Sequence, residues 1–495
     1  MFKTIARRHR RDRDLPERAW TLGVLRAVLD GTFYDVMPRE FHEEKDGPGG
    51  YVPLRDRAPS VRYNLCRMVV EDSVGMVFGE EHFPRVACTD RELAASLNGL
   101  VQETNLPSVM TSAAISGSVG SVAILMRVLE GRVFWQVMDT ECLTPEWDPK
   151  APDTLKRVTE LYKVRAPALK AQGYAVDDGN RWYWFQRVWD AEREIWYLPW
   201  PVTPTEKDPK PVGPQEDEQR TVAHNLGFVP IEWVRNLPGG SVTGAACDGV
   251  CTFKPGIDTQ IELEYQLSQA GRGLKYSSDP TLVVKEPAAP EGEYVKSGDN
   301  ALVVSEKGDA KLLESGGTAA EAVIAYAKFL REVALETMHG NRADPQRFSG
   351  AQSGRALEMM NYGLIGLAGH LRTSYGKGAM LRLLQMVLRA STKITIKCGD
   401  DKTLPKAAGA ARLALIWPDW YPLSPEERRE QAQTLQILEG SGLMSQETAV
   451  GAVCDSYDVA DHQAELARIR AEQAEEDKRL AAQGAKVTAS EQIPT

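Results

Sequence analysis

A stretch from about Gly256 to Ala390 constrains this chain most, because it alternates long helical patterns with a short β-rich insert and a polar loop. Apolar residues recur at helical spacing in three segments, namely IDTQIELEYQLSQAGRG, TAAEAVIAYAKFLREVALETM and the run from Ser353 to about Ala390. Thr318 opens the second segment with Glu321 three residues later, which is the spacing of a capping box. Three helices of this length must each find a surface to pack against.

The first of these helices carries a stripe that is only partly apolar, made of Ile257, Ile261, Glu264/Tyr265 and Ser268. Burying a polar side chain is costly unless it finds a partner. We therefore expect this helix to pack against other chains as much as against its own. The second helix has a more continuous apolar series, which comprises Val323, Tyr326, Ala327, Leu330, Val333, Ala334 and Met338.

The segments that join and follow these helices predict a small β element, a loop and two more strands. TLVVK and ALVVSE are rich in β-branched residues and are separated by Pro/Gly turns, and AKLLE is expected to pair with them. The glycines and proline of HGNRADPQRFSGAQSG predict a polar loop. After the third helix, TKITIKCGD and ARLALIWPD are predicted strands.

The first half of the chain predicts helices and strands together. Helices are expected over 15–30, over SVRYNLCRMVVEDSVGMVFG, over 90–104 and over 106–119. In the second of them Ser60 is the expected N-cap and Gly79 the expected stop. Its buried face is expected to consist of Val61, Leu65, Met68, Val69 and Met76. The last of the four helices is rich in small residues, which permit close approach of another segment. SVAILMRVLEGRVFWQVMD predicts a β-hairpin that turns at Glu130–Gly131.

An arginine cluster precedes the first helix and consists of Arg7, Arg8, Arg10, Arg11 and Arg13. Such clusters form either a solvated tail or an arm that contacts nucleic acid or an acidic partner. The start of the chain lacks an apolar signal core, so we do not expect secretion, and Asp12 and Asp14 argue against a mitochondrial presequence.

An aromatic run over 180–200 supports two interpretations. Its tryptophans could stack on sugar rings, which would make the chain a carbohydrate-binding protein or an enzyme. Alternating aromatic residues on a hairpin more often form the packing face of a sheet, and we favour that interpretation. The Pro-rich, charged segment 201–220 that follows predicts an exposed connection.

Length and charge limit the class of protein. A chain of 495 residues is too long for one ordinary core, so two or more lobes are expected. No apolar run approaches the roughly 18 residues of a membrane span. With 59 Lys and Arg against 69 Asp and Glu, the net charge is −10. A protein that grips nucleic acid should be basic, so tight sequence-independent DNA binding by the whole surface is not expected.

The sequence carries no recognisable catalytic, cofactor or metal motif. It has no phosphate-binding loop, dinucleotide turn, HExxH or GxSxG pattern. Its seven cysteines are scattered and do not complete a zinc spacing, which favours reduced thiols in an intracellular setting. We therefore expect no enzyme activity, no cofactor and no metal.

The C-terminal segment predicts further helices. LSPEERREQAQTLQILEGSGLMS opens with Ser424 as N-cap, Pro425 at the first helical position and Glu427 as a capping-box partner. Ser445 caps a short helix over QETAVGAV. DHQAELARIRAEQAEEDKRLAAQ is expected to be a charged helix with a thin apolar stripe.

The order of these elements resembles the portal (head–tail connector) proteins of tailed bacteriophages over nearly the full length. Four passages carry the resemblance: NLCRMVVEDSVGMVFGEEHFPRV (64–86), HNLGFVPIEWVRN (224–236), DPTLVVK with ALVVSEKGDAKLLE (279–314), and YPLSPEERREQAQTLQILEGSGLMSQETAV (421–450). The Trp-rich strands and the Pro-rich loop depart from the family's pattern.

The resemblance implies an α+β portal fold assembled as a ring. Its parts would be an N-terminal arm and wing over 1–255, stem helices over 256–276 and 317–338, a clip over 277–316, a tunnel loop over 339–353, a long wing helix with returning strands over 354–423, a crown over 424–482 and a disordered tail over 483–495. In a ring of twelve, a net charge of −10 per chain sums to about −120, which would let DNA slide rather than adhere.

The resemblance also implies where DNA and proteins would meet the ring. The tunnel-loop candidates are Arg342, Asp344, Gln346 and Arg347, and the secondary channel candidates are Arg272 and Lys275. The clip-docking candidates are Lys285, Glu286, Glu291 and Lys296. The implied partners are further copies of the chain, double-stranded DNA in the channel, the terminase large subunit, a head-completion or adaptor protein, and the major capsid and scaffolding proteins. No membrane is implied.

The resemblance further implies a structural role at one vertex of the virion, after assembly in the host cytoplasm, with DNA packaged and ejected through the ring. The alternatives are the carbohydrate-binding protein or enzyme on strands 182–200, and another virion structural or adaptor protein.

Overall fold

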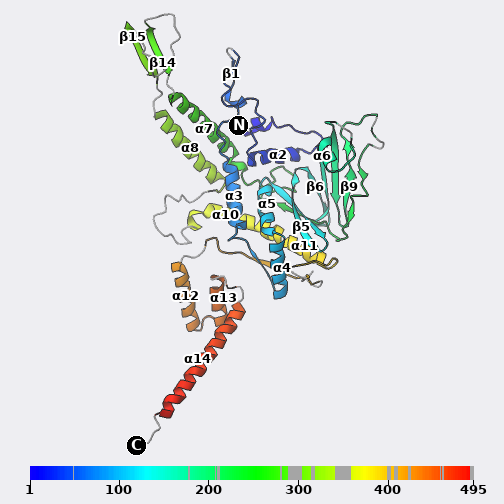
Figure 1. The fold of residues 1–495 in the computed structure, drawn as a ribbon, viewed down its shortest axis with the longest axis vertical. Coiled ribbons are helices and arrows are strands. Elements are labelled where there is room, and N and C mark those ends of the chain that lie inside the picture. The colour runs from blue at the N-terminus through cyan, green and yellow to red at the C-terminus, as the bar shows by residue number, and fades with distance from the viewer. Residues whose placement is uncertain are drawn as a thin grey trace. The chain divides into compact units, whose positions relative to one another are not determined.

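The computed structural model describes residues 1–47, 50–176, 179–206, 208, 212–278, 281–287, 304–313, 318–340, 358–398, 403–405, 411–421, 425–456, 459 and 462–490. The chain divides into two compact units, one of residues 1–342 and 362–418 and one of residues 343–361 and 419–495. Both helices and sheets are present, so the fold is α+β, as expected (Figure 1).

The first unit contains most of the sheet structure. A three-stranded sheet has the order β13–β4–β5, with β4 (Ser121–Leu129) in the middle, β5 (Arg132–Asp139) and β13 (Ile231–Arg235). A larger sheet consists of β6 (Leu143–Asp148), β7 (Ala151–Arg165), β8 (Trp182–Trp189), β9 (Arg193–Leu198) and the short strands β10 (Trp200–Pro201), β11 (Gln215–Glu216) and β12 (Val222–Ala223). Two further pairs join β1 (Lys45–Asp46) to β2 (Gly50–Tyr51) and β3 (Arg85–Cys88) to β16 (Leu413–Ile416).

Helices surround these sheets. They are α1 (Phe2–Ala6), α2 (Glu17–Leu29), α3 (Leu65–Phe78), α4 (Arg91–Glu103), α5 (Leu106–Gly117) and α6 (Ala166–Ala171). Three 3₁₀ turns lie at Leu54–Asp56, Thr140–Cys142 and Lys254–Gly256. The hairpin of β4 and β5 turns at Glu130 and Gly131, both at positive φ, as the sequence predicts.

The aromatic run over 180–200 is a packing face. Trp189 is fully buried in the core shared by β4, β7 and β13. Tyr183 and Phe185 pack with α6. Trp182 is 43% exposed, but the guanidinium of Arg165 lies 4.9 Å from its ring centroid. The interpretation that we favoured for this run therefore fits the structure, and most of its rings are not free to stack on a sugar.

Ion pairs connect parts of the arginine cluster and its neighbouring acids to the rest of the chain. Arg8 pairs with Asp56, and Arg11 lies 3.3 Å from Glu17. Asp12 and Asp14 both bind Lys163 on β7, at 2.8 and 2.5 Å. All five arginines nevertheless remain exposed, and both interpretations of the cluster stay predictions.

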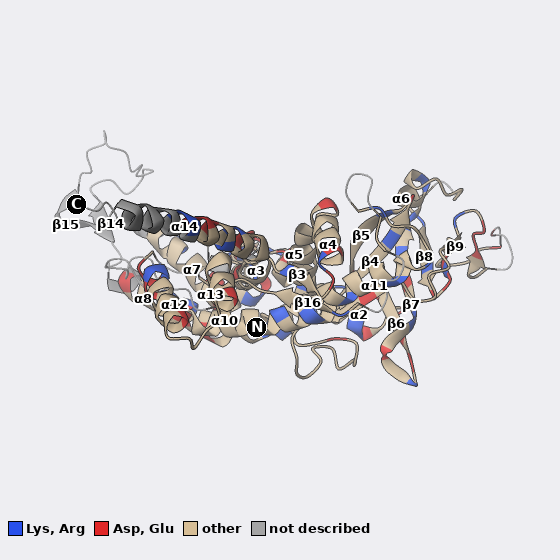
Figure 2. Cartoon of the chain, turned by 90° about the horizontal axis from the view of Figure 1, so that it is seen from below, with Lys and Arg blue, Asp and Glu red and all other residues tan. Residues whose placement is uncertain are grey.

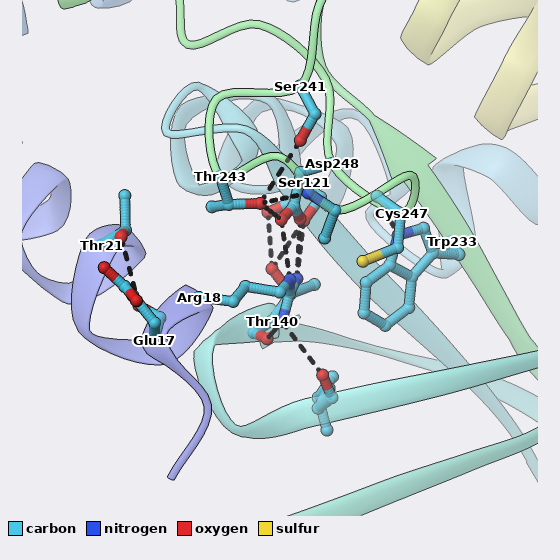
Figure 3. A network of polar contacts seen from close by, with 12 residues as sticks. Glu17, Arg18, Thr21, Ser121, Thr140, Trp233, Ser241, Thr243, Cys247 and Asp248 are labelled. Carbon is cyan, nitrogen blue, oxygen red and sulfur yellow. Dashed lines mark hydrogen bonds and ion pairs between the residues drawn. The ribbon is translucent and has the colours of Figure 1, made fainter. Parts of the chain in front are cut away.

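A buried polar network joins three distant segments of this unit (Figure 3). Arg18 of α2 binds both oxygens of Asp248 at 2.7 Å and donates to the carbonyl oxygens of Thr140 and Leu143. Ser121, the first residue of β4, donates to Asp248 at 2.6 Å. The Asp248 side chain is fully buried. A charge at such depth is tolerated only because all of these partners are present.

The long helix from Tyr362 to Ser391 is continuous but changes its type. It runs as α10 (Tyr362–Leu371), a π-helical segment (Arg372–Met380) and α11 (Leu381–Ser391). The π-helical turns bring the buried Tyr375 hydroxyl to Asn236, to which it donates at 3.0 Å. A Cβ at Gly117, at the end of the small-residue helix α5, would overlap that hydroxyl. The close approach expected of this helix is thus confirmed.

Four expectations about local structure are wrong. Helix α3 begins at Leu65, because Asn64 rather than Ser60 caps it, accepting from the Arg67 amide at 3.1 Å. Val61 is consequently exposed. The segment TKITIKCGD contains one isolated bridge and no strand among its described residues 392–398. It follows directly on α11, which extends to Ser391. In the second unit, α14 (His462–Ser490) continues past residue 482, so residues 483–490 are helical where a disordered tail was expected.

The second unit holds α12 (Pro425–Gly440), α13 (Gln446–Ser456) and α14. Ser424 lies outside the described residues, so its predicted capping role is untested. Within the part of the chain that the structure describes, no helix is both long and apolar enough to cross a bilayer, and no three His, Cys, Asp or Glu side chains gather as a metal site. None of the seven cysteines forms a disulfide.

Replacing Arg18 by alanine tests the buried network. The change leaves the Asp248 carboxylate buried without its counter-charge, which costs about 3–5 kcal/mol, so the melting temperature of the variant should fall by many degrees. Arg67→Ala is the matched control, because it breaks only exposed pairs, with Glu71 and Asp30, each worth under about 1 kcal/mol. Equal melting temperatures for the two variants would contradict this account.

Candidate functional site: the helical hairpin α7–α8

Helices α7 (Ile257–Ser278) and α8 (Thr318–Thr337) lie side by side as an antiparallel hairpin, with β14 (Thr281–Pro287) and β15 (Val304–Leu313) at its far end (Figure 1). The helix bounds agree with the sequence prediction to within two residues. The expected pairing of TLVVK with AKLLE is confirmed, since Leu282 lies opposite Leu312 in an antiparallel ladder.

The mixed stripe of α7 is satisfied within the chain itself. Glu264 is 1% exposed, accepts a hydrogen bond from the Tyr34 hydroxyl, and receives another from Gln260 at 3.3 Å. Ser268 accepts from the Val61 amide at 3.0 Å. The loop and helix of residues 34–66 therefore supply partners for the polar members of this stripe. The expectation that α7 also packs against other chains stays a prediction.

Helix α8 differs because it has two apolar faces. Ala327, Leu330, Ala334 and Met338 form a buried face. A second stripe, which we call the outer stripe, consists of Ala322, Ala325, Tyr326 and Phe329, at the i, i+3, i+4 and i+7 spacing of one helix face. Tyr326 is 44% exposed and Phe329 is 58% exposed. The outer stripe has no covering element among the described residues of this chain.

The third side of α8 is charged. Lys328, Arg331 and Glu332 are exposed there, and Ile324 lies among them at 50% exposure. Basic and acidic residues are likewise interspersed over the other elements instead of segregating (Figure 2). Helix α8 therefore exposes one apolar surface and one mixed-charge surface.

The predicted site residues fall into three groups. Arg272 is held by Glu44, with Nε and Nη2 each 2.5 Å from a carboxylate oxygen, and Lys275 is exposed in the last turns of α7. Lys285 and Glu286 lie on β14, with Lys285 opposite Asp309 and a register shift at Glu286. The third group lies outside the described residues: Glu291, Lys296, Arg342, Asp344, Gln346 and Arg347.

Sequence reasoning missed the outer stripe of α8 as a separate surface. The apolar series predicted for this helix mixed Tyr326 with residues of the buried face. The signal was present in the sequence, because Ala322, Tyr326 and Phe329 recur at helical spacing on one side. The sequence does not tell which of the two apolar stripes of α8 is covered by α7, because this depends on the position of α7 in the fold.

Burial raises the pKa of Glu264 to about 7, against an ordinary value of 4.5, although the Tyr34 hydrogen bond opposes the change. The folded chain therefore keeps a proton that the unfolded chain releases between about pH 4.5 and 7, so this group contributes stability at low pH that is lost as pH rises through 7. Glu264→Gln removes the titrating carboxyl, so this loss of folding stability with rising pH should be absent in the variant. Relative to wild type, the variant should gain stability with rising pH, by about 3 kcal/mol at pH 8.

The measurement is thermal melting of both proteins across pH 4–8. Glu71→Gln, which alters an exposed carboxylate on α3, serves as the control and should follow wild type. A constant difference between Glu264→Gln and wild type over this range would show that the carboxyl does not titrate as described.

Comparisons with known proteins give one informative match. A family model described as "Phage portal protein, SPP1 Gp6-like" matches residues 51–479. A search of curated proteins finds no match. Among solved structures, a chain of "Virion of native gene transfer agent (GTA) particle" aligns with 78% of this chain and 88% of its own length, at 12% identity and a TM-score of 0.36. A likeness at that level carries no weight beside the family match.

Proposed function

The chain belongs to the SPP1 Gp6-like phage portal protein family, and from this premise we propose that its copies form a closed ring through which double-stranded DNA is packaged and ejected. A portal protein is a structural component of the virion and part of a capsid-associated oligomeric assembly. We propose twelve copies at one capsid vertex, assembled in the host cytoplasm, with no catalytic activity of their own.

The observation that best supports a ring is the outer stripe of α8. Large exposed apolar side chains on one helix face commonly mark an interface with another protein. A neighbouring copy that covers the stripe with a different part of its own surface makes a head-to-tail contact. Contacts of that kind generate rings when the rotation closes. The hairpin α7–α8 would thus be the wall of the ring, with α7 anchored in its own chain and α8 facing its neighbour.

The specific partners are part of the same proposal. The β14–β15 pair, at the end of the hairpin, would dock the terminase large subunit and a head-completion or adaptor protein through Lys285, Glu286, Glu291 and Lys296. The elements before α7 would contact the major capsid and scaffolding proteins. DNA would contact Arg342, Asp344, Gln346 and Arg347, and more weakly Lys275 and Arg272, whose guanidinium Glu44 already holds.

Phe329→Asp tests the ring wall. Burying an aromatic side chain contributes about 1.5–3 kcal/mol, and the substitution replaces that contribution with an unpaired charge at every contact. Native mass spectrometry should show loss of the closed ring at protein concentrations where wild type assembles. Because Phe329 is 58% exposed in the single chain, the variant should keep its fold and its circular dichroism spectrum.

Ile324→Asp is the matched control, since Ile324 is 50% exposed on the charged side of the same helix. Its ring should persist. Rings that survive Phe329→Asp, or that are lost equally in both variants, would remove the outer stripe from the interface. A wild-type chain that stays monomeric at all concentrations would contradict the portal ring itself.

Charge reversal at Arg342 and Arg347 tests the proposed DNA contact. Each arginine would add one weak, salt-sensitive contact to a phosphate, so Arg342→Glu with Arg347→Glu should leave ring assembly intact and impair DNA packaging or retention. The readouts are ring mass and the amount of nuclease-protected DNA in particles. Normal packaging by the double variant would exclude these residues from the mechanism.

A further inference from the structure

The second unit has an incomplete apolar core of its own. None of the described residues of α12 is buried. Only Ala449, Cys454 and Leu466 are buried among the apolar residues described in α12–α14. Between the three helices lies a groove of about 330 Å³, and its apolar lining includes Leu435, Val450, Val453, Cys454 and Ile469. The groove is large enough for an apolar side chain.

The same unit presents a prominent apolar side chain in the turn between α12 and α13. Leu443 is 80% exposed, the highest value among the large apolar residues described in this unit. Its backbone is fixed, because its amide donates to the Leu438 carbonyl at 3.0 Å after Gly442 turns at φ +71°. In such helix ends this position usually packs back on the last helical turn. Here the side chain projects into solvent instead.

The groove and the exposed side chain belong to different surfaces of the unit. Ala432, Leu435, Gln436 and Glu439 line the groove and share one face of α12. At 3.6 residues per turn, Ile437 lies on another face, and it is 70% exposed. Leu443 does not line the groove either. Its exposed side chain, which we call the knob, therefore does not fill the groove of its own chain.

We propose that the Leu443 knob of one copy inserts into the α12–α13–α14 groove of the next copy around the ring. This inference rests on the proposed ring. A knob and a groove on separate surfaces of one subunit make a head-to-tail contact, which repeats around a closed ring without leaving an unpaired surface. The contact is independent of α8 and would give the second unit the apolar burial that it lacks alone.

The chemistry of the groove favours a copy of this chain over DNA as the occupant. Its lining is mostly apolar, and its charged members, Glu439 and Glu465, are acidic. Phosphates would be repelled there. Leu443 is apolar, held in one backbone conformation and present once in every subunit, so inserting it orders few further torsions.

Crosslinking of assembled rings tests the contact. Leu443→Cys is combined with Leu435→Cys, a half-buried position in the groove, and the rings are treated with a short bismaleimide. Every copy then carries both reactive positions. We expect a ladder on a denaturing gel that extends from dimers to the covalently closed ring. The matched control combines Leu443→Cys with Thr434→Cys, an exposed position of α12 outside the groove, and should not give the ladder.

Each other outcome overturns the proposal. Dimers without longer species would mean that two knobs meet each other, and equal ladders with Thr434→Cys would mean that the knob lies elsewhere. Intact rings without crosslinks would refute the knob contact while leaving the ring, whereas absence of wild-type rings by native mass spectrometry would refute the proposed function itself. Cys454 lines the groove and could itself react with the knob, so it is replaced by alanine in every variant. The other native cysteines are present in every variant, so their contribution appears in the controls.

Labelling of the groove gives a second, independent readout. Leu435→Cys should react with a maleimide about tenfold more slowly in rings than in the unassembled Phe329→Asp background, given the affinity expected from burying one leucine. Adding Leu443→Asp should restore fast labelling while the rings persist. Protection that is unchanged by Leu443→Asp would mean that some other protein segment fills the groove.

Discussion

The ion pair of Arg18 and Asp248 holds together the part of the structure from which the hairpin extends. The Asp248 carboxylate is fully buried, so it is stable only where a guanidinium and the hydroxyl of Ser121 meet it. The same loop continues through Gly249, whose amide donates to Gly120 at 2.8 Å, and then enters α7. The direction of the hairpin therefore depends on a contact between the N-terminal helix, a central strand and the loop before α7.

A second polar contact extends this arrangement to the long helix over residues 362–391. Asn236 donates to the carbonyls of Ser118 and Val250 and accepts from Tyr375 of the π-helical segment. Ser118 and Ser121 border the start of β4, so both networks converge on one short segment. The hairpin that we propose as the wall of the ring would rest on this base, because α8 buries only part of its apolar surface in its own chain.

The sequence allowed good prediction wherever periodicity and local caps decide the structure. The bounds of α7 and α8, the turn at Glu130–Gly131 and the strand at Leu413–Ile416 follow from local patterns. The π-helical segment was not predictable in this way, since it depends on Tyr375 reaching Asn236 from 139 residues away in the chain. The start of α3 was misplaced because Ser60 and Asn64 are both good caps and only the fold selects Asn64.

At the candidate site, too, local patterns were predictable from the sequence and long-range contacts were not. The mixed stripe of α7 suggested packing against other chains, but long-range folding brings Tyr34 and the Val61 amide of the same chain to Glu264 and Ser268. The apolar pattern of α8 was recognised, yet its separation into a buried face and an outer stripe required the position of α7. The charged side of α8 carries Lys328 and Arg331 beside Glu332. Mixed charges of this kind give a duplex no continuous band of cations to bind, which would suit the DNA channel that we propose.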